Sequence, residues 1–256
     1  MNILTIILLS IIEGITEFLP ISSTGHLILT STLLKIAHND ITKHFEIFIQ
    51  LGAISAVILY YWNYLLKHKN LWKTILIGFL PVACVGFVYY EYITAILFEQ
   101  PLIILSMLFL GGIVLVFIEK IFPDKQITTS LHTITPKQAI IIGLFQILSI
   151  IPGVSRAAST IVGGMIIGLD RKTTVEFSFL LAIPTIAGAV FLDIVKADSN
   201  LISLHLFSFS LGFFISFITA LFVIKYFLRF ISHHSLSYFG YYRIILSILF
   251  WIVISA

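Results

Sequence analysis

Long apolar runs separated by short polar segments occur along the whole chain. Six of these runs are long enough, or nearly so, to cross a hydrocarbon core of about 30 Å at about 1.5 Å per helical residue. They cover 45–66, 74–91, 101–119, 176–195, 206–230 and 241–256. The pattern predicts an all-α polytopic membrane protein with six full transmembrane helices.

Two further apolar regions, 3–35 and 138–169, are each interrupted near the middle. The interruptions read Leu19-Pro20-Ile21-Ser22 and Ile151-Pro152-Gly153-Val154, and the pieces on either side are short for a crossing. Proline removes a backbone donor and disfavours helix at the residue before it. Each region is therefore predicted to be a re-entrant helical hairpin, whose irregular tip survives in a membrane only inside protein or beside water.

The two halves of the chain correspond to each other. One constant offset along the sequence superposes Pro20 on Pro152, Ser23 on Ser155 and Phe45 on Phe177. Each half would contain one hairpin followed by three full helices, and an odd number of crossings inverts the second half. We therefore predict inverted-topology repeats, about 1–119 and 137–256, in one integral membrane domain spanning 1–256. Broken helices at matching positions indicate a site where the halves meet.

Composition supports the membrane assignment and excludes several classes. Hydrophobic residues make up 59% of the chain and charged residues 11%, whereas roughly a quarter of a soluble domain is charged. No basic segment or small-residue cleavage site precedes Glu13, so a removable signal peptide is not expected. The chain has no P-loop and no zinc-type Cys/His spacing. We expect no organic cofactor and no nucleic-acid partner, and we expect Cys84 to be a buried thiol in an apolar segment.

The distribution of charge predicts the orientation. The side carrying 67–73, 120–137, 171–172 and the ends near 225–243 holds eleven Lys or Arg, and the opposite side holds Lys35, Lys43 and Lys196. By the positive-inside rule the basic loops are cytoplasmic. Both termini and the mouth of the first hairpin are then expected outside.

Two carboxylates, Glu13 and Glu17, stand four residues apart before the first break. In a helix they share one face, where like charges repel unless a cation or a shared proton lies between them. They are candidates for general acid or base catalysis and candidate ligands of Mg²⁺ or Ca²⁺. The alternative is a pair of carboxylates that only caps a polar cavity.

After the first break, Ser22, Ser23 and Thr24 begin the second half-helix, followed by Gly25 and His26. Free backbone N–H groups and the positive end of the helix dipole favour an anion there, although a serine at a helix start is often only an N-cap. His26 lies three residues after Ser23 and four after Ser22, on the same helical face. It is a candidate acid or base beside candidate hydroxyl nucleophiles, unless it is a satisfied core histidine.

The second tip carries Arg156, whose planar guanidinium can bind phosphate through two hydrogen bonds. The alternative is that Arg156 forms an internal ion pair with Glu13 or Glu17. Both interpretations are correct if the ion pair opens when the ligand binds. The remaining candidates for ligand binding are Ser22, Thr24, Gly25, Ser155, Ser159, Thr160 and Gln50. Two helix N-termini, an arginine, hydroxyls and carboxylates together predict phosphoryl chemistry.

The chain resembles the undecaprenyl-diphosphatase family, bacterial membrane enzymes also known for bacitracin resistance. The resemblance covers the whole chain and is carried by Glu13 to His26, Phe45-Glu46, Ile49-Gln50-Leu51-Gly52, Pro152-Gly153-Val154-Ser155-Arg156 and Glu176-Phe177-Ser178-Phe179-Leu180-Leu181. The family commonly has Ser-Gly-Ala after the arginine, where this chain has Ala157-Ala158-Ser159. A hydroxyl role at the first of these positions is therefore absent or taken over by Ser159.

The resemblance implies removal of the terminal phosphate from a C55 isoprenoid diphosphate at the outer face, which regenerates the lipid carrier of cell-wall synthesis. By the same resemblance Ser23 is the nucleophile or primary phosphate ligand and Arg156 clamps the diphosphate. Glu13, Glu17 and His26 then serve proton transfer and metal binding, with the division of roles left open.

Two other functions are compatible with the pattern. A transporter or flippase of an anionic polyprenyl lipid is the alternative, because inverted repeats with broken helices also occur in transporters. A non-catalytic assembly subunit is a third interpretation. The sequence leaves both a monomer and a homodimer open.

Overall fold

The computed structural model describes residues 1–36, 39–96, 101–123, 130–196 and 205–255. Throughout this part of the chain the regular structure is helical, with no strand. The elements are α1 (Ile3–Thr16), α2 (Ser23–Leu33), α3 (Asp40–Lys67), α4 (Asn70–Ile96), α5 (Pro101–Ile121), η1 (Leu131–Thr133), α6 (Pro136–Gln146), η2 (Ile147–Ile150), α7 (Arg156–Ile166), α8 (Arg171–Lys196), α10 (Leu206–Ile231) and α11 (Ser237–Ser255).

Among the described residues, five helices are long and apolar enough to cross a membrane: α3, α4, α5, α8 and α10. They match five of the six predicted full spans and confirm an all-helical polytopic membrane protein. Pro81 and Pro184 lie inside α4 and α8 without ending them. The sixth predicted span, 241–256, corresponds to α11, which is 19 residues long, and residue 256 lies outside the described residues.

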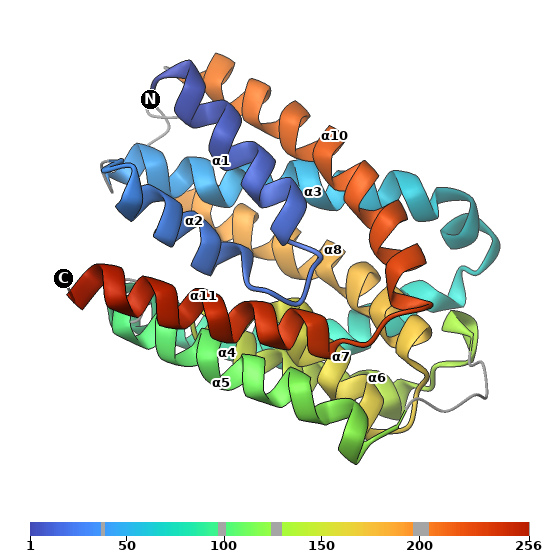
Figure 1. Cartoon of the computed structure of the whole chain (residues 1–256). Coiled ribbons are helices and arrows are strands. Elements are labelled where there is room, and N and C mark those ends of the chain that lie inside the picture. Colours follow the sequence, from blue (N-terminus) through green and yellow to red (C-terminus); the bar gives the residue numbers. More distant parts are fainter. Residues whose placement is uncertain (37–38, 97–100, 124–129, 197–204, 256) are drawn as a thin grey trace.

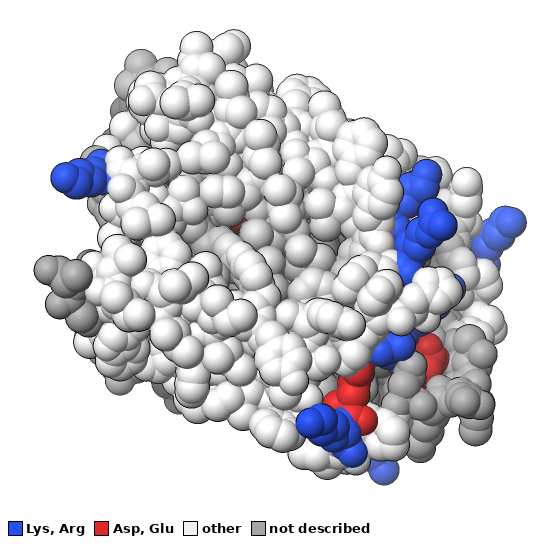
Figure 2. Space-filling model, in the orientation of Figure 1, with Lys and Arg blue, Asp and Glu red and all other residues white. Residues whose placement is uncertain are grey.

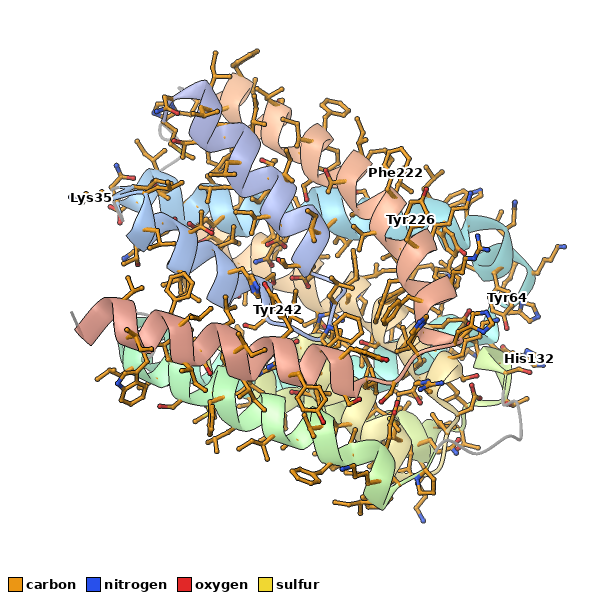
Figure 3. The ribbon with its side chains drawn as sticks, in the orientation of Figure 1. Lys35, Tyr64, His132, Phe222, Tyr226 and Tyr242 are labelled. Carbon is orange, nitrogen blue, oxygen red and sulfur yellow. The ribbon has the colours of Figure 1, made fainter. Side chains whose placement is uncertain are left out.

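The outer surface of the helices is apolar, as expected of a lipid-facing surface. On α10, Phe222 and Tyr226 project away from the molecule and are 61% and 65% exposed (Figure 3). Cys84 on α4 is also exposed, so the expectation of a buried thiol was wrong. Sequence alone does not distinguish the lipid-facing side of an apolar helix from its packed side, because both are hydrophobic.

Most Lys and Arg side chains visible on the face shown in Figure 2 gather at one end of the molecule, and a single basic side chain marks the other end. Lys35 lies at that second end (Figure 3). Lys125, one of the residues assigned to the basic loops, lies outside the described residues. The assignment of Arg243 to those loops was wrong, because its side chain is fully buried inside the molecule.

Helices from the two halves of the chain pack against each other (Figure 1). Helix α1 packs on α10 from the second half of the chain, and α6 packs on α4 from the first half. The central helix α8 contacts α3, α4 and α7. This arrangement brings the segment after α1 and the segment after η2 into the interior, where polar side chains can meet.

Both chain breaks lie where the sequence predicts them, and they share one backbone geometry. Ser22 caps α2 with φ of 71°, and Ser155 caps α7 with φ of 77°; both values are uncommon for a residue other than glycine. Each Ser side chain accepts a hydrogen bond from the backbone N–H three residues later. The structural equivalents are therefore Ser22 and Ser155, and Ser23 corresponds to Arg156 rather than to Ser155 as the sequence alignment placed it.

Several helix pairs approach so closely that only glycine fits at the contact, among them α3 with α10 and α4 with α6. A Cβ on Gly52 of α3 would lie 2.3 Å from the Phe213 carbonyl oxygen of α10, and a Cβ on Gly143 of α6 would lie 2.1 Å from the Gly78 carbonyl oxygen of α4. We expect Gly52→Ala or Gly143→Ala to lower the free energy of unfolding by about 1–3 kcal/mol, because backbone on the facing helix must move. A lower Tm in detergent measures this effect.

Gly86→Ala is the matched control, since a Cβ there meets nothing within 4 Å. Alanine favours helix over glycine, so Tm should stay level or rise. Equal Tm values for the Gly52 and Gly86 variants would contradict the close packing.

Candidate active site

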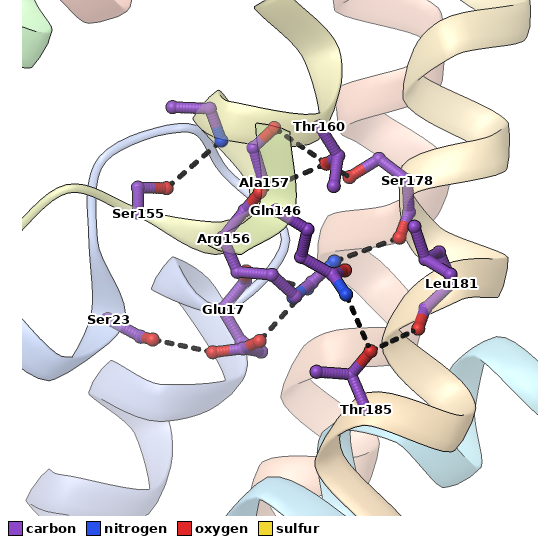
Figure 4. Close-up of polar contacts among 11 residues, drawn as sticks. Glu17, Ser23, Gln146, Ser155, Arg156, Ala157, Thr160, Ser178, Leu181 and Thr185 are labelled. Carbon is purple, nitrogen blue, oxygen red and sulfur yellow. Dashed lines mark hydrogen bonds and ion pairs between the residues drawn. The ribbon is translucent and has the colours of Figure 1, made fainter. Parts of the chain in front are cut away.

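Three side chains from the two tips form one polar contact (Figure 4). The Ser23 hydroxyl donates to Glu17 Oε2 over 2.5 Å, and Arg156 Nη2 donates to Glu17 Oε1 over 2.9 Å. Glu17 is the C-cap of α1, whereas Ser23 and Arg156 are the first residues of α2 and α7. The Glu17 carboxylate thus holds together the starts of two helices that come from opposite halves of the chain.

Arg156 is oriented by α8 as well as by Glu17. Its Nη1 donates to the Ser178 carbonyl over 2.8 Å, and the hydroxyls of Thr160 and Ser178 lie 2.6 Å apart, joining α7 to α8. Arg156 Nε is buried and has no hydrogen-bond partner among the described residues. The guanidinium therefore has a fixed orientation, and its Nε is a buried donor that no described residue satisfies.

A cavity of about 150 Å³ lies beside this contact. It is lined by Glu17, Ser22, Ser23, Thr24, Gln50, Ser149, Ile150, Ile151, Pro152, Gly153, Ser155, Arg156, Thr185, Ile186 and Ala189. Seven of the residues predicted from sequence are among them, including Gln50 from α3. The space-filling view shows a hollow near the centre of its face, with acidic side-chain atoms visible at the bottom (Figure 2).

His26 is not among the residues lining this cavity. Its Nδ1 lies 2.7 Å from the Ser22 carbonyl oxygen, and its Nε2 lies 2.8 Å from the Tyr242 hydroxyl of α11 (Figure 3). A carbonyl can only accept, so Nδ1 is the donor, and in a neutral ring Nε2 accepts from tyrosine. The group that receives the Ser23 hydrogen bond is Glu17, and a catalytic role for His26 stays a prediction.

The other predicted residues lie around the site without lining the cavity. Ser159 donates to the Ser155 carbonyl over 3.0 Å within its own helix, and Gly25 N–H donates to Ser22 Oγ. Ala157 is buried. In this geometry Ser159 does not supply the hydroxyl that family members carry at the position of Ala157.

The cavity also contains two hydroxyl residues that the sequence analysis did not identify, Ser149 and Thr185. Thr185 Oγ1 donates to the Leu181 carbonyl and accepts from Gln146 Nε2 over 3.1 Å. Ser149 had a signal only in the sequence alignment, which places it on Glu17; the structural correspondence of Ser22 with Ser155 places Ile150 there instead. Thr185 had no such signal, since it sits in the middle of an apolar span.

Glu13 is a buried carboxylate beside the site that makes no hydrogen bond to any described residue. Its side chain is fully buried, and neither carboxylate oxygen has a hydrogen-bond partner among the described residues. The described residues contain no group of three or more His, Cys, Asp or Glu that could hold a metal. Metal binding by Glu13 and Glu17 stays a prediction: a hard divalent cation held by two carboxylates would take its other oxygen ligands from water and substrate, as Mg²⁺ commonly does.

Fold and site together define a multi-pass membrane protein with a buried polar cavity built from two broken helices. Residues 6–249 match the family model described as Bacitracin resistance protein BacA. The chain belongs to this family.

Three relatives named undecaprenyl-diphosphatase are similar over nearly their full length. The protein from Aquifex aeolicus is 45% identical over 244 residues, which is 95% of both chains. The protein from Sulfurihydrogenibium sp. is 47% identical over 98% of this chain and 99% of its own. The protein from Wolinella succinogenes is 45% identical over 98% and 97%.

Proposed function

We propose that this protein is a membrane phosphatase that hydrolyses undecaprenyl diphosphate to undecaprenyl phosphate and inorganic phosphate. The observation that carries the proposal is the contact of Ser23 and Arg156 with Glu17 at the wall of a polar cavity. The relatives' name supplies the lipid diphosphate as substrate. Recycling of the cell-wall lipid carrier and bacitracin resistance follow from this activity.

Binding begins with the exchange of one anion for another. The diphosphate replaces Glu17 as the partner of the Arg156 guanidinium, whose fork matches two phosphate oxygens. The free N–H groups at the starts of α2 and α7 add further donors. The released Glu17 carboxylate is then free to accept a proton.

Two routes for the chemical step use the same residues. In the first, Glu17 takes the Ser23 proton while Oγ attacks the terminal phosphorus, the bond to the bridging oxygen breaks, and polyprenyl phosphate leaves. Water then hydrolyses the phosphoserine. In the second, Ser23 only binds phosphate and Glu17 activates the attacking water. Trapping of phosphoserine on Ser23 during turnover distinguishes the routes.

Glu13 and Glu17 would hold Mg²⁺ or Ca²⁺ in this site, and the cation would neutralise charge on the diphosphate. Chelation with EDTA is therefore expected to lower hydrolysis, and added Mg²⁺ or Ca²⁺ to restore it. In Glu13→Gln the metal concentration for half-maximal rate should rise about tenfold or more, since even a residue that only orients a metal ligand has that effect. Glu119→Gln, which removes a carboxylate that pairs with Arg171 outside the cavity, should keep the parent requirement. Full activity in EDTA would contradict a metal requirement.

The proposed topology has six crossings and two re-entrant hairpins in two inverted repeats, forming one domain over 1–256. It is supported by the reciprocal packing of α1 on α10 and α6 on α4, and by the matching caps Ser22 and Ser155. The end where both termini lie is opposite the basic end (Figures 1 and 2). With the basic end in the cytoplasm, the termini and the mouth of the site face outside. All three residues of the contact, Glu17, Ser23 and Arg156, come from one chain.

Release of inorganic phosphate from undecaprenyl diphosphate by the purified protein in detergent tests the proposal. Hydrolysis needs no second compartment, whereas transport does. Absence of phosphate release together with movement of the lipid between leaflets of proteoliposomes would favour the flippase alternative.

A further inference from the structure

Arg243 of α11 is the largest side chain that is fully buried among the described residues. Its five N–H bonds are matched by five backbone carbonyls. Nε donates to Leu108, Nη1 to Pro20 and Val154, and Nη2 to Met107 and Gly153, over 2.8 to 3.2 Å. An arginine has five donors and no acceptor, so no donor is left for substrate. No carboxylate pairs with it among the described residues.

The carbonyls that Arg243 binds belong to both tips. Pro20 and Gly153 precede the capping serines Ser22 and Ser155 by two residues each, so they are equivalent positions in the two tips. Irregular backbone at membrane depth leaves carbonyls without partners, and each unsatisfied group is costly in lipid. Arg243 satisfies three such carbonyls and joins the first tip to the second.

Glycines make room for this side chain. A Cβ on Gly111 of α5 would lie 2.2 Å from Arg243 Nη2 and 2.7 Å from its Cζ. Gly240, one turn earlier on α11, lies similarly close to the Gly112 carbonyl oxygen, at 2.7 Å from a built Cβ. The close contact of α5 with α11 thus leaves the space through which the guanidinium reaches the tips.

We propose that Arg243 is a positioning residue that fixes the two tips relative to each other and thereby sets the placement of Glu17 and Ser23 against Arg156. Glu17 lies three residues before Pro20, and Arg156 lies three residues after Gly153. Arg243 does not touch the reacting atoms. The expected loss of activity rests on the proposed function. The expected loosening of the two tips does not, because it can be measured without turnover.

The test uses the purified full-length protein in detergent with Arg243→Gln, Arg243→Lys and Gly111→Ala, and Arg171→Gln as the matched control. Arg171 forms a 2.9 Å ion pair with Glu119 outside the cavity. Hydrogen exchange is measured for peptides covering 18–24 and 150–157 and for peptides of α3 and α10. In Arg243→Gln and Gly111→Ala, exchange is expected to rise at both tips and stay at the parent level in α3 and α10. Arg243→Lys should fall between parent and Arg243→Gln, because an ammonium offers three donors from one point.

The kinetic expectation for Arg243→Gln is a fall in kcat/KM of about 10²-fold, the effect of a misplacement near 1 Å, with KM raised as well as kcat lowered. Arg171→Gln should keep the parent KM. Hydrogen exchange at the two tips that stays at the parent level in Arg243→Gln would overturn the inference. An equal rise of exchange in every helix would also overturn it, because Arg243 would then stabilise only the whole protein. An inactive parent would refute the proposed function, and tip exchange would still decide the role of Arg243.

Discussion

Replacement of Glu17 by glutamine is expected to lower kcat/KM for a polyprenyl diphosphate by about 10³-fold, within the range for loss of a general base. The amide has nearly the same shape but cannot take the proton that the Ser23 hydroxyl donates over 2.5 Å. It also removes the negative partner of Arg156. Because the effect is on proton transfer, kcat should fall more than KM rises. Phosphate release by purified protein over a range of substrate concentrations measures both.

Glu46→Gln is the matched control for this change. Glu46 lies on α3, accepts a hydrogen bond from the Ser31 hydroxyl over 3.1 Å, and does not line the cavity. It repeats the carboxylate–serine contact of Glu17 and Ser23 outside the cavity lining. Parent-like kinetics in Glu17→Gln, or an equal loss in both variants, would refute the assignment of Glu17 as the base.

Replacement of Arg156 by lysine should lower kcat/KM by about 10³-fold, comparable to loss of the arginine that stabilises charge in other phosphoryl transfers. Lysine keeps the charge but loses the planar fork. It cannot hold the Ser178 carbonyl and the Glu17 carboxylate in their present directions while also reaching a phosphate. Here KM should rise together with the fall in kcat, since Arg156 acts in binding as well as in the reaction. The same phosphate-release assay measures both constants.

Arg171→Lys is the control, because Arg171 makes an ion pair with Glu119 that does not line the cavity. Its kinetics should stay close to the parent. If Arg156→Lys kept the parent KM, the guanidinium would not be the clamp for the diphosphate. Tm values of both variants show whether any loss of activity reflects unfolding instead.

Particular residues show how much of the structure the sequence predicts. The breaks at Pro20 and Pro152 are predictable because proline occurs there among polar and glycine residues, whereas Pro81 and Pro184 stand in apolar runs and lie within helices. The Glu17, Ser23 and Arg156 candidates follow from the cost of placing polar groups in lipid. The sequence leaves open whether Arg156 pairs with Glu13 or with Glu17, and the structure shows the pair with Glu17.

The sequence by itself determined the membrane class, the two broken helices and most of the polar residues at their tips, because hydropathy and proline act locally along the chain. Only the tertiary structure decided which of these residues meet. In that structure His26 contacts Tyr242, Ser22 and Ser155 are the equivalent helix caps, and Thr185 lines the cavity. Arg243, which was expected in a basic loop, donates hydrogen bonds to backbone carbonyls of both tips. Such contacts depend on how helices far apart in the sequence pack. The residues around a single arginine near a helix end look the same whether its side chain lies in a basic loop or is buried between the two tips.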